Sequence, residues 1–171
     1  MHIVLHNPEI PQNTGNIGRT CVATGSVLHL IEPLGFRLNE KEIRRSGMDY
    51  WEQLKVERHV NYEAFLSWYH ENVPEGTLWF TTTKAEKTYA DAHYAKDDAL
   101  VFGAESAGIP EEILVADKAH CIRIPMVDTA RSLNLSNAVS VVLYEALRQQ
   151  GFDGLTTQGA LHRLSWDVAG L

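Results

Sequence analysis

Residues 124–137, IPMVDTARSLNLSN, join the last predicted strand of the chain to its strongest predicted helix. Four side chains that can form hydrogen bonds lie on this loop or on the first helical turn, where backbone N–H groups have no intrahelical partner. They are Ser132, Asn134, Ser136 and Asn137. Helix capping explains one or two of them. Four such groups beside Arg131 indicate a loop that binds a ligand.

The helix that follows is predicted from its apolar spacing. In NLSNAVSVVLYEALRQQG, apolar residues recur at i, i+3, i+4 and i+7, which predicts a buried face. These positions are Leu135, Ala138, Val139, Val142 and Ala146. Because Val141 and Leu143 lie off this stripe, more than one side of the helix is expected to be buried. Gly151 predicts the end of the helix.

Short apolar runs alternate with helical patterns along the rest of the chain. Strands are predicted at residues 2–6, 26–33, 54–60, 77–83, 98–104 and 120–125. Helices are predicted at 16–25, 39–47 and 61–73, and after residue 108. This alternation predicts one α/β domain with a mostly parallel sheet flanked by helices. Ligands of such sheets bind at the carboxyl ends of the strands, which directs attention to residues 8–15, 81–84, 103–108 and 125–132.

The composition is that of one soluble domain, with 171 residues, 44% hydrophobic and 22% charged. No apolar run is long enough to span a bilayer and no secretory signal is visible, so a cytoplasmic protein is expected. Cys21 and Cys121 are predicted to be free thiols. The net charge of −7 disfavours nonspecific nucleic-acid binding, although it permits a local basic face. The eight histidines lack zinc-motif spacing, so no metal site is predicted.

PQNTGNIGR, residues 11–19, follows the first predicted strand and carries two glycines and an arginine. It contains neither GxGxxG nor the GK[ST] ending of a nucleotide-triphosphate loop, so a dehydrogenase or an NTPase is disfavoured. A turn into a helix N-terminus attracts anions, and Arg19 there would suit a phosphodiester. In the alternative interpretation, Arg19 is a surface residue and the glycines only shape a turn.

GAESAGIP, residues 103–110, follows another predicted strand. A Gly–x–Glu–x–x–Gly turn lets backbone approach a ligand closely and offers one carboxylate to a ribose or an amine. A plain strand-to-helix turn ending at Pro110 explains most of the same pattern.

Taken in order, PQNTGNIGR, LVFGAESAGIP and IPMVDTARSLNLSNAVSVVLYEAL resemble the three motifs of the SPOUT class of RNA methyltransferases, which use S-adenosyl-L-methionine. The match is closer to the small single-domain branch of tRNA (cytidine/uridine-34-2′-O)-methyltransferases. It covers residues 1–155 and leaves residues 156–171 as a tail without an assigned function. The resemblance implies a deep C-terminal trefoil knot, a feature that periodicity does not reveal.

The resemblance also implies where the cofactor binds. Backbone groups of residues 81–83, 103–108 and 124–133 would hold S-adenosylmethionine in the knot. The individual residues expected at the cofactor are Thr81, Gly103, Ile124, Met126 and Ser132. At Gly103, any side chain would push the cofactor away.

Arg19 is implied as the essential catalytic residue, either as the proton acceptor or as an electrostatic stabiliser of the developing alkoxide. Asn13 would orient the ribose or Arg19, and Asn134 would shape the facing side of the site. No metal is expected in this reaction.

The implied substrate is the wobble nucleotide 34, a C or a modified U, in the anticodon stem-loop of leucine tRNAs. Contacts to the RNA phosphates are expected from Arg44, Arg45, Lys84, Lys87 and Arg131. A homodimer is expected, with Tyr144 at its interface, although Tyr144 could equally be a core residue. The alternatives are a methyltransferase for another RNA, such as ribosomal RNA, and a knotted binding module without turnover.

Overall fold

The computed structural model of the chain describes residues 1–37 and 52–166. The helix predicted at 39–47, and with it Arg44 and Arg45, lies outside the described residues. In the described parts, strands and helices alternate along the chain as predicted.

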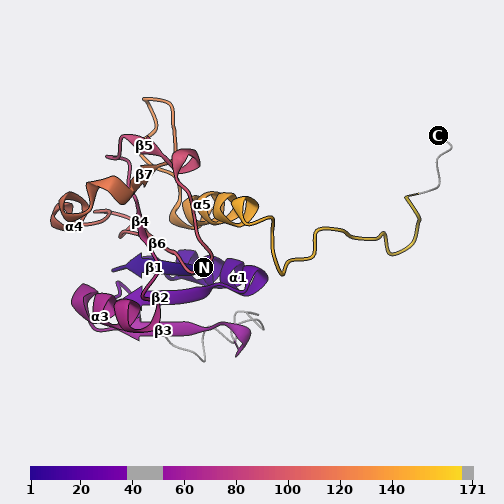
Figure 1. Ribbon diagram of the computed structural model, residues 1–171, viewed down its shortest axis with the longest axis horizontal. Helices are drawn as coiled ribbons and strands as arrows, with labels where there is room; N and C mark the ends of the chain where they lie inside the picture. The colour runs from indigo at the N-terminus through magenta and orange to yellow at the C-terminus, as the bar shows by residue number, and fades with distance from the viewer. Residues whose placement is uncertain (38–51, 167–171) are drawn as a thin grey trace.

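Seven strands form one sheet in the order β3-β2-β1-β6-β4-β7-β5 (Figure 1). They are β1 (His2–His6), β2 (Val27–Ile31), β3 (Val56–His59), β4 (Leu78–Thr81), β5 (Lys87–Thr88), β6 (Ala99–Phe102) and β7 (Cys121–Arg123). All neighbouring pairs run parallel, which confirms the predicted sheet. Only the two-residue edge strand β5 was not predicted. Strands β1, β6, β4 and β7 are consecutive in the sheet, so the four loops singled out above leave the same edge side by side.

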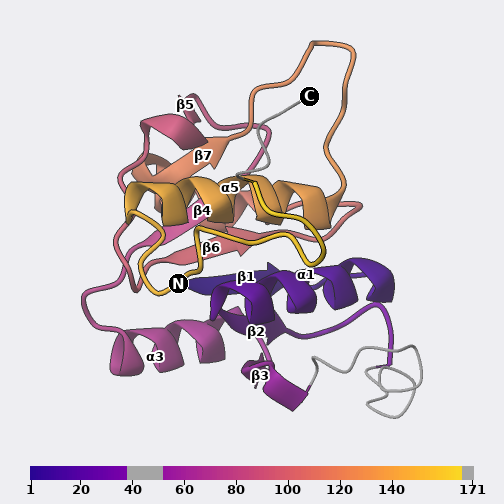
Figure 2. The ribbon, with the colours of Figure 1, turned by 90° about the vertical axis from the view of Figure 1, so that its right-hand side faces the viewer.

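Helices α1 (Pro11–Thr24) and α5 (Leu135–Gln149) cover one face of the sheet, where Figure 2 shows them side by side. Helices α3 (Tyr62–Asn72) and α4 (Glu111–Ala116) cover the other face. Strands β1 and β6 are buried on both faces and read as continuous apolar runs, as in other parallel sheets covered on both sides. None of the described helices is both long and apolar enough to cross a membrane.

Three imidazoles form a chain across neighbouring strands on the α3 face. Nδ1 of His2 lies 2.9 Å from Nε2 of His29, and Nδ1 of His29 lies 3.0 Å from Nε2 of His59. His29 is fully buried, and the Trp68 ring lies with its centroid 4.8 Å from the His29 ring. Burial lowers the pKa of His29 to about 3 and that of His2 to about 4, because a charged imidazole would lose its hydration there.

Helix α1 begins earlier than the sequence predicted. Pro11 occupies the first turn, where its missing N–H removes no helical hydrogen bond. Residues 11–15 are therefore helical, and Gly15 and Gly18 lie buried in the middle of the helix. The prediction that these glycines shape a turn is wrong.

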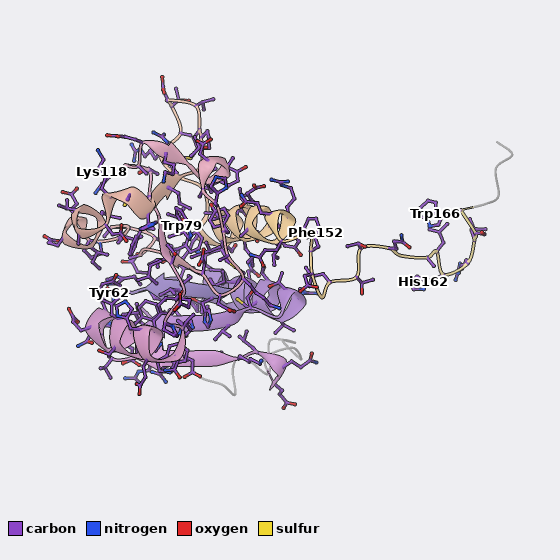
Figure 3. All side chains as sticks on the ribbon, in the orientation of Figure 1. Tyr62, Trp79, Lys118, Phe152, His162 and Trp166 are labelled. Atoms are coloured by element: carbon purple, nitrogen blue, oxygen red, sulfur yellow. The ribbon has the colours of Figure 1, made fainter. Side chains whose placement is uncertain are left out.

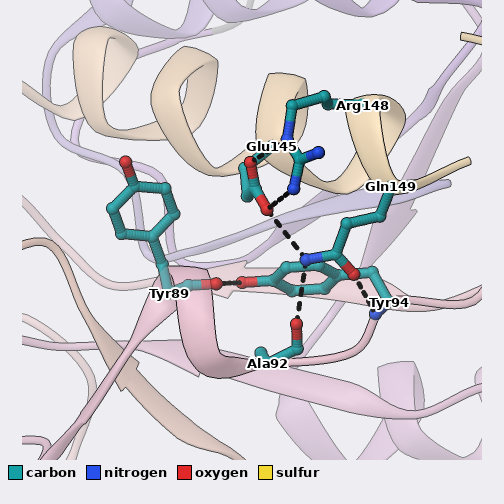
Figure 4. A network of polar contacts seen from close by, with 6 residues as sticks. All are labelled: Tyr89, Ala92, Tyr94, Glu145, Arg148 and Gln149. Atoms are coloured by element: carbon teal, nitrogen blue, oxygen red, sulfur yellow. Dashed lines mark hydrogen bonds and ion pairs between the residues drawn. The ribbon is translucent and has the colours of Figure 1, made fainter. Parts of the chain in front are cut away.

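Helix α5 is anchored to the segment after β5 through Gln149 (Figure 4). The Gln149 amide donates to the carbonyl of Ala92 at 2.9 Å and accepts from the backbone N–H of Tyr94 at 3.1 Å. The Tyr94 hydroxyl in turn donates to the carbonyl of Tyr89 at 2.6 Å. Gln149 also donates to Glu145, which pairs with Arg148. These contacts fix the end of α5 that is remote from the predicted binding loop.

The chain leaves the domain after α5. Phe152 and Leu155 still pack against the core, whereas residues 156–166 are exposed and extend away from the sheet (Figure 1). The side chains of His162 and Trp166 lie far from the domain (Figure 3). The domain boundary at residue 155 and the trefoil knot stay predictions.

Candidate functional site

A cleft of about 670 Å³ opens where the loops after β1, β4, β6 and β7 meet. Loop 103–108, called the cofactor loop below, forms one wall, and residues 81–84 form another. The segment from Ile124 to the first turns of α5 completes the cleft. Segments more than 120 residues apart therefore share one cleft, because parallel strands end at a single edge of the sheet.

Most of the predicted site residues line this cleft. They are Asn13, Thr81, Lys84, Gly103, Ile124, Met126, Arg131, Ser132 and Asn134. Arg19 and Lys87 are not among the described residues that line it.

A chain of hydrogen bonds joins the three motif loops. The side-chain amide of Asn134 donates to Oδ1 of Asn13 at 2.9 Å, and the amide of Asn13 donates to Oε1 of Glu105 at 2.9 Å. Asn13 is 5% exposed, so each end of its amide group needs a partner. Asn13 thus lies between the second and third motifs and joins them through both ends of its amide group.

The carboxylate of Glu105 is held by three N–H donors. It accepts from the backbone N–H of Glu9 at 2.8 Å, from that of Ile10 at 3.3 Å and from the amide of Asn13. Asn134 is held as firmly, because its Oδ1 caps α5 by accepting from Ser136 N at 3.0 Å and Ser136 Oγ at 2.7 Å. The orientation of the Asn13 amide is therefore set from both sides.

Gly103 is required by the cofactor loop itself. A Cβ atom at this position would lie 2.0 Å from the carbonyl carbon of Gly108 and 2.2 Å from the backbone nitrogen of Ile109. The loop closes on itself here, with Gly108 N–H donating to Ala104 O at 2.8 Å and Gly108 at a φ of +73°. The sequence argument assigned this glycine to cofactor clearance, whereas the nearest obstacle is backbone.

The cleft has the chemistry expected of an S-adenosylmethionine site. Thr81 Oγ1 is buried and has no hydrogen-bond partner within the described residues, and Thr81 lines the cleft. A buried hydroxyl without a partner costs free energy that a bound ligand can recover. Ile124, Met126 and Leu135 add apolar wall, while the backbone of the cofactor loop adds polar groups. A ligand with an apolar ring system and several polar groups fits this lining.

Arg19 lies on the solvent-facing side of α1, and it is exposed. Arg19 follows Asn13 by six positions in the helix, and this spacing corresponds to about 9 Å along the helix axis and about 120° around it. The structure therefore does not bring Arg19 into the cleft of its own chain.

The predicted RNA-binding cations that are described lie in different environments. Lys84 and Arg131 line the cleft, and Lys84 forms a 2.6 Å ion pair with Glu111. Lys87 instead donates to the carbonyl of Ala119 at 2.8 Å, and its ammonium lies 5.5 Å from the centroid of the Trp79 ring.

Tyr144 is 46% exposed on α5, which excludes the core alternative within this chain. Val141, one turn before it, is 37% exposed. Together they leave an apolar strip on the outer side of α5, while Val139, Val142 and Ala146 are buried as predicted.

Ile10 lines the cleft although the sequence analysis did not single it out, and Glu105 was considered only as a carboxylate for a ribose or an amine. The GxExxG pattern pointed to a carboxylate, but its partner Asn13 is 92 positions away. No local pattern signals a contact of that length. Among the described residues, no group of three or more His, Cys, Asp or Glu is arranged to hold a metal ion.

Comparison with known proteins agrees with this geometry. The SpoU rRNA Methylase family matches residues 1–144. A tRNA (cytidine(34)-2′-O)-methyltransferase from Escherichia coli (strain K12) is 51% identical over 155 residues, covering 90% of this chain and 96% of that protein. A solved structure concerned with the 2-OH methylation of C/U34 on tRNA is 41% identical, with a TM-score of 0.80 over 88% of this chain and 96% of that one.

A third relative is the SpoU methyltransferase AviRb from Streptomyces viridochromogenes, solved in complex with AdoMet. It is 25% identical, and the alignment covers 88% of this chain and 57% of AviRb with a TM-score of 0.76. The alternating α/β sheet, the cleft at its carboxyl edge and the match over residues 1–144 lead to one conclusion: the chain belongs to the SpoU rRNA methylase family.

Proposed function

We propose that this chain is a cytoplasmic enzyme that methylates the ribose 2′-hydroxyl of wobble nucleotide 34, a C or a modified U, in leucine tRNAs. S-Adenosyl-L-methionine is the methyl donor. The observation that carries the proposal is the Asn134–Asn13–Glu105 chain at the cleft, since it ties all three motif loops to one point. Relatives that carry the name of this activity cover nearly the whole domain.

The cleft residues divide into two groups by their chemistry. Thr81, Gly103, Ile124, Met126 and Ser132 are assigned to the cofactor. Asn13, Glu105 and Asn134 form the polar side, where a ribose would be oriented. When bound, the cofactor supplies a methyl group already activated on a sulfonium.

As the ribose hydroxyl attacks, an O–C bond to the methyl group forms while the C–S bond of the sulfonium breaks, and the hydroxyl proton passes to solvent water. Negative charge develops on the ribose oxygen in this step. Both oxygens of Glu105 already accept N–H groups, so we assign Glu105 to orienting Asn13. Arginine stays protonated in proteins. We therefore assign Arg19 to holding the neighbouring phosphate and stabilising the developing alkoxide, rather than to accepting the proton.

The position of Arg19 supports a homodimer in which each chain completes the cleft of its partner. Arg19 faces solvent, away from the cleft of its own chain, and Val141 and Tyr144 leave an apolar strip exposed on the neighbouring helix α5. Lys84 and Arg131 at the cleft, with Lys87 nearby, are assigned to the phosphates of the anticodon stem-loop. Such contacts make binding salt-sensitive in spite of the net negative charge.

The activity is tested with labelled S-adenosylmethionine and tRNA that lacks the modification, followed by nucleoside analysis. Label on the ribose of nucleotide 34 supports the proposal. Label in ribosomal RNA alone moves the target to another RNA. Cofactor binding without any transfer indicates a binding module without turnover.

The shared site is tested by mixing two inactive variants, Arg19→Ala and Asn13→Ala. If Arg19 acts in the partner's cleft, about a quarter of wild-type activity returns, since about half of randomly assorted dimers are mixed and each has one intact site. Arg58→Ala, another exposed arginine, is the control and should stay active. Mixtures that remain inactive, although the chains exchange, would contradict the shared site.

A further inference from the structure

Glu9, in the loop between β1 and α1, exchanges hydrogen bonds with the cofactor loop in both directions. Its carboxylate accepts from the backbone N–H of Ser106 at 2.9 Å and from the Ser106 hydroxyl at 2.6 Å. In return, the backbone N–H of Glu9 donates to Glu105 Oε2 at 2.8 Å. Three hydrogen bonds thus link Glu9 to the cofactor loop across 96 to 97 positions in the sequence.

The cofactor loop depends on such outside contacts for its position. Its one cross-bridge within the described residues joins Ala104 and Gly108. In the tip between them, Glu105 to Ala107, the residues Ser106 and Ala107 are exposed. The side-chain contacts described for this tip lead to Glu9 and to its neighbours Ile10 and Asn13.

The backbone around Glu9 is fixed by the loop after β2. The backbone N–H of Gly35 donates to Pro8 O at 2.9 Å, and a Cβ atom at residue 35 would lie 2.7 Å from the Glu9 Cα. The backbone of Glu9 is therefore wedged between the loop after β2 and the cofactor loop. A carboxylate on a fixed backbone can fix what it binds.

We propose that Glu9 is a positioning residue for S-adenosylmethionine binding, which it sets by holding the tip of the cofactor loop through Ser106. The inference rests on the proposed use of this loop for the cofactor. Glu9 does not line the cleft, so its effect on affinity passes through Ser106 and Glu105.

Substitutions at residue 9 can distinguish the effect of its hydrogen bonds from the effect of its negative charge. A glutamine at residue 9 keeps both bonds, because its carbonyl can accept from the Ser106 N–H while its NH₂ donates to the Ser106 hydroxyl, which turns to accept. An alanine keeps neither bond. Geometry rather than charge therefore predicts that Glu9→Gln behaves like the wild type and Glu9→Ala does not.

The test is the dissociation constant of S-adenosylmethionine, measured by calorimetry without RNA. Glu9→Ala should weaken binding about tenfold, because the tip of the loop loses both hydrogen bonds to this side chain, and Glu9→Gln should stay within about twofold. Ser106→Ala, which loses only the hydroxyl bond, should weaken it about threefold. Both single variants lose the same hydrogen bond between the Ser106 hydroxyl and Glu9. In the double variant Glu9→Ala/Ser106→Ala the two losses of affinity should therefore not add.

Glu86→Ala is the control, since Glu86 pairs with Lys118 at 2.9 Å on the surface away from the cleft. Unchanged affinity in both Glu9→Ala and Ser106→Ala would overturn the proposal, as would additive losses in the double variant. If Glu9→Ala does not fold, Ser106→Ala decides alone. A wild-type protein that binds the cofactor but methylates no tRNA would refute the proposed function and leave this test intact.

Discussion

Acidification from pH 7 to pH 5 should destabilise the fold through the chain of His2, His29 and His59. Burial holds the pKa of His29 at about 3 and that of His2 at about 4, against about 6.5 in an unfolded chain. Below pH 6.5 these histidines therefore bind protons in the unfolded chain but stay neutral in the folded chain. Stability is complete above pH 6.5 and falls until the folded histidines also protonate, near pH 3 to 4.

The size of the effect follows from the pKa values of His29 and His2. The unfolded-state pKa of each histidine lies about 1.5 pH units above pH 5, and each pH unit costs about 1.36 kcal/mol of folding free energy. Each of the two histidines therefore lowers the free energy of unfolding by about 2 kcal/mol at pH 5. The pair gives about 3 to 4 kcal/mol, the lower figure allowing for solvent screening at the half-buried His2. The lowered pKa of His59 adds in the same direction. Such a loss is a large part of the free energy of unfolding of a typical domain, which is about 5–15 kcal/mol.

Urea unfolding followed by circular dichroism at pH 7, 6 and 5, at constant ionic strength, measures this loss. Glutamine does not titrate, so His29→Gln removes one of the two protonation sites. The free energy of unfolding of this variant should therefore fall by about 2 kcal/mol less than that of the wild type between pH 7 and pH 5. His70→Gln, an exposed histidine of α3, is the matched control and should keep the full pH dependence. Equal stability of the wild type at pH 7 and pH 5, or an unaltered pH dependence in His29→Gln, would refute this reasoning.

Three further outcomes are expected. Gly103→Ala should destabilise the fold by about 2 kcal/mol or more, because its Cβ would lie 2.0 Å from the carbonyl carbon of Gly108; thermal unfolding measures this, and an unshifted melting temperature would contradict it. Trp79→Phe should cost about 1–3 kcal/mol in urea unfolding, since it leaves an oxygen of the buried Asp98 without the 2.9 Å bond from the indole N–H. Arg131→Ala should weaken tRNA binding and lower the slope of log affinity against log salt by about 0.7 to 0.9, whereas an unchanged slope would remove Arg131 from the RNA surface.

The helices and strands followed largely from local patterns. The alternation of apolar runs with helical spacing predicted six of the seven strands, and the stripe on α5 predicted the burial of Val139, Val142 and Ala146. These succeed because a strand that is buried on both faces of a parallel sheet shows as a short apolar run, as β1 and β6 do. The two-residue strand β5 carries too few residues to leave such a mark.

At the start of α1 the local pattern was misleading, and at Gly103 it was incomplete. Pro11, Gln12 and Asn13 resemble a turn in composition, but proline is also favoured in the first turn of a helix, and α1 begins there. Gly103 was assigned to clearance for a ligand because a sequence does not show that Gly108 folds back against it.

Loop composition was enough to identify the segments that line the cleft, because helix starts and glycine turns expose backbone groups wherever they occur. Which side chains meet was decided by the tertiary structure. Asn134 reaches Asn13 across 121 positions, and Asn13 reaches Glu105 across 92, only because β1, β6, β4 and β7 lie in one parallel sheet and end at one edge. The same packing turned Arg19 away from the cleft of its own chain, since the face of α1 that carries Asn13 is buried and the face that carries Arg19 meets solvent.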